Sequence, residues 1–202
     1  AILRASAYGN IRIMLPLITG VSEVRSVRTI LQNVMRELDS KEIPYDKDIL
    51  LGVMIETPAA CMLADILAKE ADFFSIGTND LTQYTIAVDR GNENVAYLYS
   101  AFHPAVLRSV KRIIECAKRE NIEVGMCGEA AGNPAMIPLL LAFGLDEFSV
   151  TASKVLETRK NIASWTMKEA AAVTDTVMGM NTEKEVSAYL SDYIATKMSN
   201  GK

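Results

Sequence analysis

Five short runs of apolar, β-prone residues constrain the fold of this chain more than any other feature. The runs are Ile11–Ile18, Leu50–Glu56, Phe73–Gly77, Val124–Cys127 and Glu147–Val150. Nearly every position in them is apolar, which is typical of strands buried on both faces of a parallel sheet. Because helical patterns separate the runs, the sequence predicts an α/β fold in which helices connect parallel strands.

The predicted helices share an apolar 3-4 spacing or a cap signal at their first residues. They begin near Val21, Thr57-Pro58, Pro104, Asn133-Pro134, Thr166 and Thr182. The second of them is expected to run unbroken over Ala59–Glu70, and after Val150 the pattern is helical throughout. This alternation fits an open doubly wound sheet or a barrel, and no GxGxxG dinucleotide-binding loop is present.

The composition excludes several classes of protein. A net charge of −4 without clusters of Lys or Arg argues against nucleic-acid binding. No apolar run approaches 18 residues, so we expect no membrane insertion. The start of the chain does not have the pattern of an export signal, and we therefore expect a cytoplasmic protein with reduced thiols.

The cysteines and the histidine carry separate expectations. Cys61, Cys116 and Cys127 lack metal-ligand spacing. Cys61 and Cys116 fall on helical patterns and are interpreted as packing residues. His103 is the only histidine, which excludes a site with several histidine ligands. It precedes Pro104 and is interpreted as a loop residue at a helix start.

Polar residues stand where three of the apolar runs end. Glu56 ends the second run, Asn79 and Asp80 follow the third, and Cys127 ends the fourth, just before Glu129. Ligands gather at the carboxyl ends of parallel strands in barrels and in open sheets alike. Two carboxylates suit Mg²⁺, which also takes water and substrate oxygens. The alternative is that both acids cap loops or pair with basic side chains.

Three long motifs, in this order, resemble those of phosphoenolpyruvate-utilising enzymes. They are Gly52-Val53-Met54-Ile55-Glu56-Thr57-Pro58-Ala59-Ala60, Ser75-Ile76-Gly77-Thr78-Asn79-Asp80-Leu81-Thr82-Gln83-Tyr84 and Gly125-Met126-Cys127-Gly128-Glu129. The later segment Val88-Asp89-Arg90-Gly91-Asn92 resembles the Enzyme I family of the bacterial sugar phosphotransferase system. Pyruvate phosphate dikinase and phosphoenolpyruvate synthase, the alternatives, usually differ there.

The resemblance implies a (β/α)8 TIM-type barrel, present here in part. Residues 1–202 would be the C-terminal part of one phosphoenolpyruvate-binding barrel domain, with the last five strands, their helices and further C-terminal helices. The upstream strands and an N-terminal phosphohistidine domain would lie outside the chain. The start agrees with this, because Ala1–Ala7 has the pattern of a helix end and Ala1 is not an initiating Met.

The resemblance also implies a role for each site residue. Glu56 and Asp80 would hold Mg²⁺, Asn79 would donate a hydrogen bond to phosphoenolpyruvate, and Arg90 would pair with its anionic oxygens. Cys127 would protonate the enolate to give pyruvate. The alternatives are a surface ion pair of Arg90 with Asp89 or Glu93 and a purely packing role for Cys127. For Glu129 two roles remain open, namely orienting the thiol and orienting the loop.

The partners follow from the same resemblance. The phosphoryl group would pass to a histidine of the N-terminal domain and then to a small phosphocarrier protein, and the protein would be a homodimer. The chain alone is expected not to turn over, since strands and acceptor are missing. The alternatives are a fragment of one of the two related enzymes and a non-catalytic dimerisation module of the same fold.

Overall fold

The computed structural model describes the backbone of residues 1–200 and the side chains of residues 1–197. Its centre is a sheet of five strands: β1 (Ile13–Leu15), β2 (Leu51–Ile55), β3 (Phe73–Gly77), β4 (Glu123–Cys127) and β5 (Glu147–Phe148). Every neighbouring pair is parallel, and the strands lie side by side in chain order. The five predicted strands are therefore confirmed.

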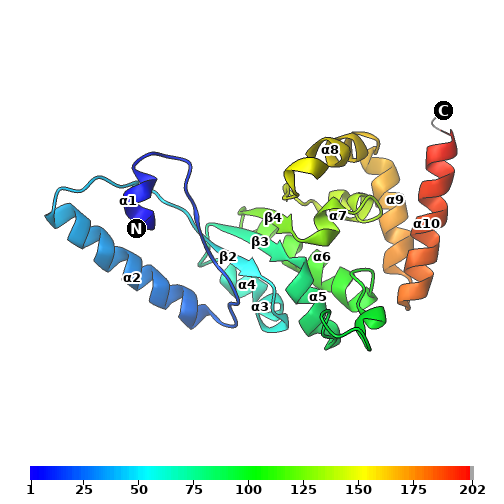
Figure 1. The fold of residues 1–202 in the computed structure, drawn as a ribbon, viewed down its shortest axis with the longest axis horizontal. Coiled ribbons are helices and arrows are strands. Elements are labelled where there is room, and N and C mark those ends of the chain that lie inside the picture. Colours follow the sequence, from blue (N-terminus) through cyan, green and yellow to red (C-terminus); the bar gives the residue numbers. More distant parts are fainter. Residues whose placement is uncertain (201–202) are drawn as a thin grey trace.

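The helices begin and end close to the predicted positions, and Figure 1 shows their arrangement. They are α1 (Ile2–Ser6), α2 (Val21–Ser40), α3 (Pro58–Met62), α4 (Ala64–Leu67), α5 (Thr78–Ile86), α6 (Pro104–Arg119), α7 (Ile137–Phe143), α8 (Val155–Ala163), α9 (Met167–Met178) and α10 (Glu183–Asn200), with 3-10 turns η1 (Ala96–Leu98), η2 (Glu129–Gly132) and η3 (Ala152–Lys154). The first two helices lie at one end of the molecule, and α9 and α10 lie side by side at the other (Figure 1). None of the helices in the described part of the chain is long and apolar enough to cross a bilayer.

The strand order decides between the two architectures that the sequence leaves open. A doubly wound sheet must reverse its strand order at a switch point, whereas strands that follow one another in chain order carry their helices on one face. The order β1-β2-β3-β4-β5 has no reversal. The sheet is therefore a segment of barrel wall, as predicted.

One face of the sheet forms the main core with the helices. Val53, Ile55, Ile76, Val124 and Met126 are fully buried in this core, which α4, α6 and α7 complete. The prediction that all strands are buried on both faces is wrong. The three central strands are buried on the face that packs against the helices, but Met54, Ser75 and Cys127 on their other face are only partly buried. Within the described residues, β1 and β5 each have one strand neighbour, and both remain partly exposed.

The opposite, concave face is closed at the amino-terminal end of the strands by one aromatic ring. The ring of Phe73 lies over Gly52 of the neighbouring strand, where an added Cβ would be 2.4 Å from the ring. The guanidinium of Arg12 stands 5.4 Å from the ring centroid and pairs with Glu123 at 2.6 Å. This ion pair joins two residues that are 111 positions apart in the chain, and it crosses β2 and β3.

The first strand is shorter than predicted. The apolar run Ile11–Ile18 contains only three strand residues, because Pro16 has no N–H to donate to a ladder and Leu17 adopts a left-handed φ of 51°. The chain turns there toward α2.

The prediction of a single helix over Ala59–Glu70 is also wrong, because the chain leaves the helical conformation at Leu63, which separates α3 from α4. The guanidinium of Arg112, from α6, donates to the carbonyl oxygens of Cys61 and Met62 at 3.2 and 2.8 Å. These carbonyls would otherwise accept bonds from the next helical turn, so a residue about fifty positions away interrupts the helix.

The helix start predicted at Asn133-Pro134 is wrong, since Asn133 opens a turn by accepting from the Ala135 N–H at 2.9 Å and α7 begins only at Ile137, without a side-chain cap. The caps predicted at Thr57, Thr166 and Thr182 are confirmed. The Thr57 hydroxyl accepts from the third residue of α3, Thr166 forms a capping box with Glu169, and Thr182 exchanges bonds with Glu185. His103 ends a loop and caps α6, its Nδ1 accepting from the Ala105 N–H at 3.2 Å.

We predict that Gly52→Ala destabilises the chain by about 1–3 kcal/mol, because the new methyl group must displace the Phe73 ring. Urea unfolding of the chain measures this as a lower midpoint. Gly179→Ala is the matched control, since Gly179 already has helical backbone angles and its added Cβ would make only ordinary contacts, the nearest at 3.5 Å. Equal midpoints for the two variants would contradict the close contact between Gly52 and Phe73.

Candidate active site

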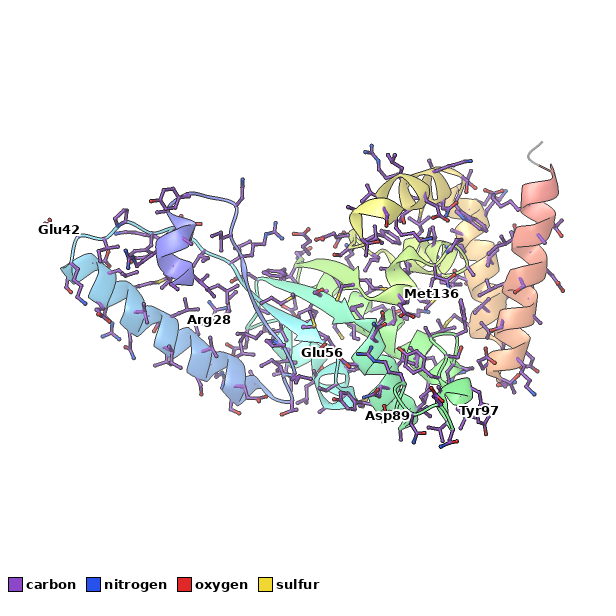
Figure 2. The ribbon with its side chains drawn as sticks, viewed as in Figure 1. Arg28, Glu42, Glu56, Asp89, Tyr97 and Met136 are labelled. Carbon is purple, nitrogen blue, oxygen red and sulfur yellow. The ribbon has the colours of Figure 1, made fainter. Side chains whose placement is uncertain are left out.

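The residues singled out in the sequence come together at the carboxyl ends of three strands. Glu56 directly follows β2, Asn79 and Asp80 lie two and three residues after β3, and Cys127 ends β4. Cys127 is in register with Gly77, the last residue of β3. Figure 2 shows Glu56 near the middle of the molecule, beside the tips of the strands. The concave edge of the sheet therefore carries two acids, an amide and a thiol.

The carboxylate of Glu56 is buried, with only 4% of the residue exposed. Its Oε1 accepts a hydrogen bond of 2.8 Å from the N–H of Leu17, in the turn after β1. Its Oε2 lies over Gly77, where an added Cβ would be 2.6 Å away. Only glycine at position 77 leaves room for this approach. The acid is thus held by two neighbouring strands.

The electrostatics of Glu56 suit a bound cation. Burial raises the pKa of its carboxyl group, the Leu17 N–H lowers it, and the nearby carboxylate of Asp80 raises it again. A buried carboxylate whose ionisation is disfavoured by a second acid gains from a nearby positive charge. Among the described residues no group of three or more His, Cys, Asp or Glu side chains could hold a metal ion. A cation here would therefore need water or substrate oxygens as further ligands, as Mg²⁺ commonly has.

Arg90 reaches this site from the loop after α5. Its guanidinium lies 3.5 Å from the Asp80 carboxylate, and its backbone N–H donates to the Gln83 side chain at 3.2 Å. The ion pair therefore joins Arg90 to Asp80 and not to Asp89 or Glu93, the partners considered from the sequence. The head of an exposed arginine thus stands beside an acid of the candidate metal site.

Asn79 lies in the first turn of α5, which begins directly after β3. Its Oδ1 accepts from the N–H of Glu129 at 3.3 Å, which leaves the two N–H donors of its amide for another acceptor. Its backbone carbonyl accepts from the hydroxyl of Tyr99 at 3.1 Å. Glu129, whose role the sequence left open, holds Asn79 through its backbone amide.

Cys127 is partly exposed, whereas Cys61 and Cys116 are buried in the core as predicted. Its thiol donates toward the Ile76 carbonyl at 3.6 Å, and the Ser75 hydroxyl lies 3.9 Å from the sulfur. Burial raises the pKa of this thiol, Ser75 opposes the rise, and the charges of Glu56 and Asp80 reinforce it. The thiol therefore keeps its proton at neutral pH, and it can act as an acid.

Two contributors to the site had no role in the sequence interpretation. Ser75 lies two residues before Gly77 on β3. The alternation of side chains along a strand would therefore have placed it on the same face of the sheet as Gly77. Tyr99 lies in an irregular segment, and no pattern indicates its contact with Asn79.

A small cavity adjoins the candidate site, and a larger groove lies away from it. The cavity, of about 230 Å³, lies beside Asn79, lined in part by Tyr99, Phe102 and Glu129. The groove, of about 1100 Å³, lies between α8, α9 and α10, around Trp165 and Tyr193, and contains none of the predicted site residues. The smaller cavity is the one that adjoins the candidate site.

The fold and the candidate site indicate an enzyme of the (β/α)-barrel class, and the similarities of the chain to known proteins agree with this. The chain matches the family described as "PEP-utilising enzyme, PEP-binding domain" over residues 1–167, and it belongs to that family. Its curated relatives include phosphoenolpyruvate-protein phosphotransferases. That of Geobacillus stearothermophilus is 48% identical over 190 residues, that of Listeria monocytogenes 47% over 195 and that of Bacillus subtilis 45% over 192. The resemblance predicted from the motifs is confirmed.

These alignments include 94%, 96% and 95% of this chain but only 33%, 34% and 34% of the three relatives. The chain thus spans about a third of the length of the curated relatives it matches. A citrate lyase from Burkholderia xenovorans LB400 is a structural neighbour, with a TM-score of 0.59 and 16% identity, covering 99% of this chain and 67% of that one. At this identity the likeness shows the fold alone, and it agrees with a partial barrel.

We predict that Glu56→Gln stabilises the metal-free chain progressively as the pH rises. A carboxyl group whose pKa is raised in the folded state contributes its stability below its unfolded pKa, near 4.5, and loses it as the pH rises through the folded value. Glutamine does not ionise and can still accept from Leu17. Urea unfolding in a chelating buffer should show the variant gaining on the natural chain between pH 4 and pH 7.

Glu23→Gln is the control of opposite sign. The backbone N–H groups of Thr19 and Gly20 lower the pKa of Glu23, so its stability is present at neutral pH and is lost on acidification. The control variant should lose stability relative to the natural chain over the same range. A stability difference for Glu56→Gln that is constant with pH would contradict the strain assigned to its carboxylate.

Proposed function

We propose that this chain is the phosphoenolpyruvate-binding and enolate-protonating part of a phosphotransferase. The enzyme would move the phosphoryl group of phosphoenolpyruvate to a protein histidine and release pyruvate, as the first step of sugar uptake. The observation that carries the proposal is the meeting of Glu56, Asp80 and Cys127 at one edge of the sheet. The relatives named phosphoenolpyruvate-protein phosphotransferase support it.

Phosphoenolpyruvate would be bound at this edge by groups of complementary charge. Glu56 and Asp80 would hold Mg²⁺, which would neutralise charge on the phosphate and carboxylate oxygens of the substrate. The free N–H groups of the Asn79 amide would donate to the substrate, and the guanidinium of Arg90 would meet a second anionic group. Asn79 and Asp80 also lie in the first turn of α5, where unpaired backbone N–H groups favour an anion.

The chemistry separates into two transfers. The bond between phosphorus and the enol oxygen breaks as phosphorus bonds to an imidazole nitrogen of the acceptor histidine, and its electron pair stays on the enolate. The methylene carbon of the enolate then takes the proton of the Cys127 thiol, which gives pyruvate and a thiolate. Water returns the proton to the thiolate. The raised pKa of Cys127 keeps this proton in place until the enolate forms.

The acceptor histidine would lie on a separate N-terminal domain, from which a small phosphocarrier protein takes the phosphoryl group. His103, the only histidine of the chain, caps α6 through Nδ1 and is assigned no catalytic role. The three free cysteines suit the reducing cytoplasm. The single-neighbour strands β1 and β5 favour completion by further strands, and we propose a homodimer of the whole protein.

The competing functions are less favoured. Pyruvate phosphate dikinase and phosphoenolpyruvate synthase share the family, but the relatives cited above carry the name of the protein phosphotransferase. A non-catalytic dimerisation module would have no use for a buried acid next to a second acid, which destabilises the metal-free fold. The proposed enzyme requires both.

We predict that Cys127→Ala, in the full-length protein, lowers the rate of pyruvate formation at least about 100-fold, because the enolate loses its proton donor. A coupled pyruvate assay under steady-state conditions measures this rate. Cys116→Ala, which removes a buried thiol of α6, is the matched control and should retain activity. Undiminished pyruvate formation by the Cys127 variant would favour the non-catalytic module.

A second prediction concerns the chain by itself. The described residues form five of the eight strands of a barrel, and the proposal places the acceptor histidine on the separate N-terminal domain. Incubation of the purified chain with phosphoenolpyruvate labelled in its phosphoryl group should therefore leave the protein unlabelled. Label bound to the chain in the absence of the N-terminal domain would refute the proposal that a separate domain supplies the acceptor histidine.

A further inference from the structure

Tyr99 connects the two elements that carry the proposed substrate-binding side chains. Asn79 belongs to the first turn of α5, whereas Arg90 belongs to the irregular segment 87–103 that follows this helix. Tyr99 lies in the same segment as Arg90, just after η1. Its hydroxyl donates a hydrogen bond of 3.1 Å to the backbone carbonyl of Asn79. The segment therefore folds back onto the start of the helix that it follows.

Arg90 belongs to the same segment as Tyr99 and is held beside the start of α5. Its guanidinium lies 3.5 Å from the Asp80 carboxylate, and its backbone N–H donates to the Gln83 side chain at 3.2 Å. Burial raises the pKa of the Tyr99 phenol, and Thr82 and Arg90 lower it, which agrees with a position of Tyr99 close to Arg90. Tyr99 also lines the cavity of about 230 Å³ beside Asn79.

The neighbouring residue anchors Tyr99 from the other side. The hydroxyl of Ser100 donates to the Glu183 carboxylate at the start of α10, at 3.2 Å, and accepts from the N–H of Phe102. The backbone at position 99 is consequently fixed to a separate helix. By contrast, Tyr97, two residues earlier, is 80% exposed and lies at the rim of the molecule (Figure 2).

We propose that Tyr99 is a positioning residue, which sets the spacing between Asn79 and Arg90 so that both can contact one phosphoenolpyruvate molecule. This inference rests on the proposed function. Loss of the hydroxyl would leave both binding side chains in place but would remove the bond that ties the segment carrying Arg90 to the main chain of Asn79. Substrate binding should therefore weaken, while proton donation by Cys127, on another strand, should continue.

The test is Tyr99→Phe in the full-length protein, which removes one oxygen atom. We expect the KM for phosphoenolpyruvate to rise about 5- to 30-fold, in line with the loss of one or two hydrogen bonds, and kcat to change less than about 3-fold. The midpoint of thermal unfolding should stay within about 2 °C. Tyr97→Phe is the matched control and should leave KM and kcat as they are.

A double-mutant cycle separates positioning from general support of the fold. If Tyr99 acts through Arg90, then Tyr99→Phe should raise KM much less in the Arg90→Lys background than in the natural protein. Equal effects in both backgrounds, an unchanged KM, or a change in activity that only follows a loss of folded protein would overturn the proposal. The two failures can be told apart, because the proposed function fails if the natural full-length protein does not turn over phosphoenolpyruvate, whereas the positioning role fails on the comparison of KM values.

Discussion

The buried carboxylate of Glu56 can lie over the end of β3 only because Gly77 has no side chain, and the whole site depends on this contact. A methyl group at position 77 would stand 2.6 Å from Oε2. From there the acid accepts from the Leu17 N–H, which joins the end of β1 to the end of β2. It also approaches Asp80 closely enough for the Asp80 carboxylate to raise the pKa of Glu56. The arrangement disfavours the charged form of Glu56, and a cation bound between the two acids would stabilise that form.

The sheet brings these groups together by topology more than by local attraction. Glu56, Asp80 and Cys127 are separated by tens of residues, yet each lies at the carboxyl end of a strand of one continuous parallel sheet. Helices cover the outer face, and the ring of Phe73 with its Arg12 partner closes the amino-terminal end of the concave face. The opposite end remains for polar groups. Acid, amide and thiol side chains are therefore expected to form a site at the carboxyl ends of the strands.

Much of this arrangement could be predicted from the sequence, and what could not has a physical reason. The strands were predictable because apolar runs mark buried parallel strands, and Thr57 marked a helix start because its hydroxyl caps the backbone. The strand-end acids could likewise be located. Contacts between distant segments could not: Arg112 breaks a helix about fifty residues away, and Arg90 pairs with Asp80 although closer acids flank it. The hydroxyl of Tyr99 belongs with these, because only the folded loop gives it a partner.

A crystal structure of the full-length protein with Mg²⁺ and a non-reactive phosphoenolpyruvate analogue tests the central claim most directly. We expect one cation bonded to the carboxylates of Glu56 and Asp80, the analogue bound to that cation, and the sulfur of Cys127 in contact with the carbon that must receive a proton. A cation held elsewhere, or an analogue bound beyond reach of the Cys127 thiol, would contradict the assignment of this edge as the active site.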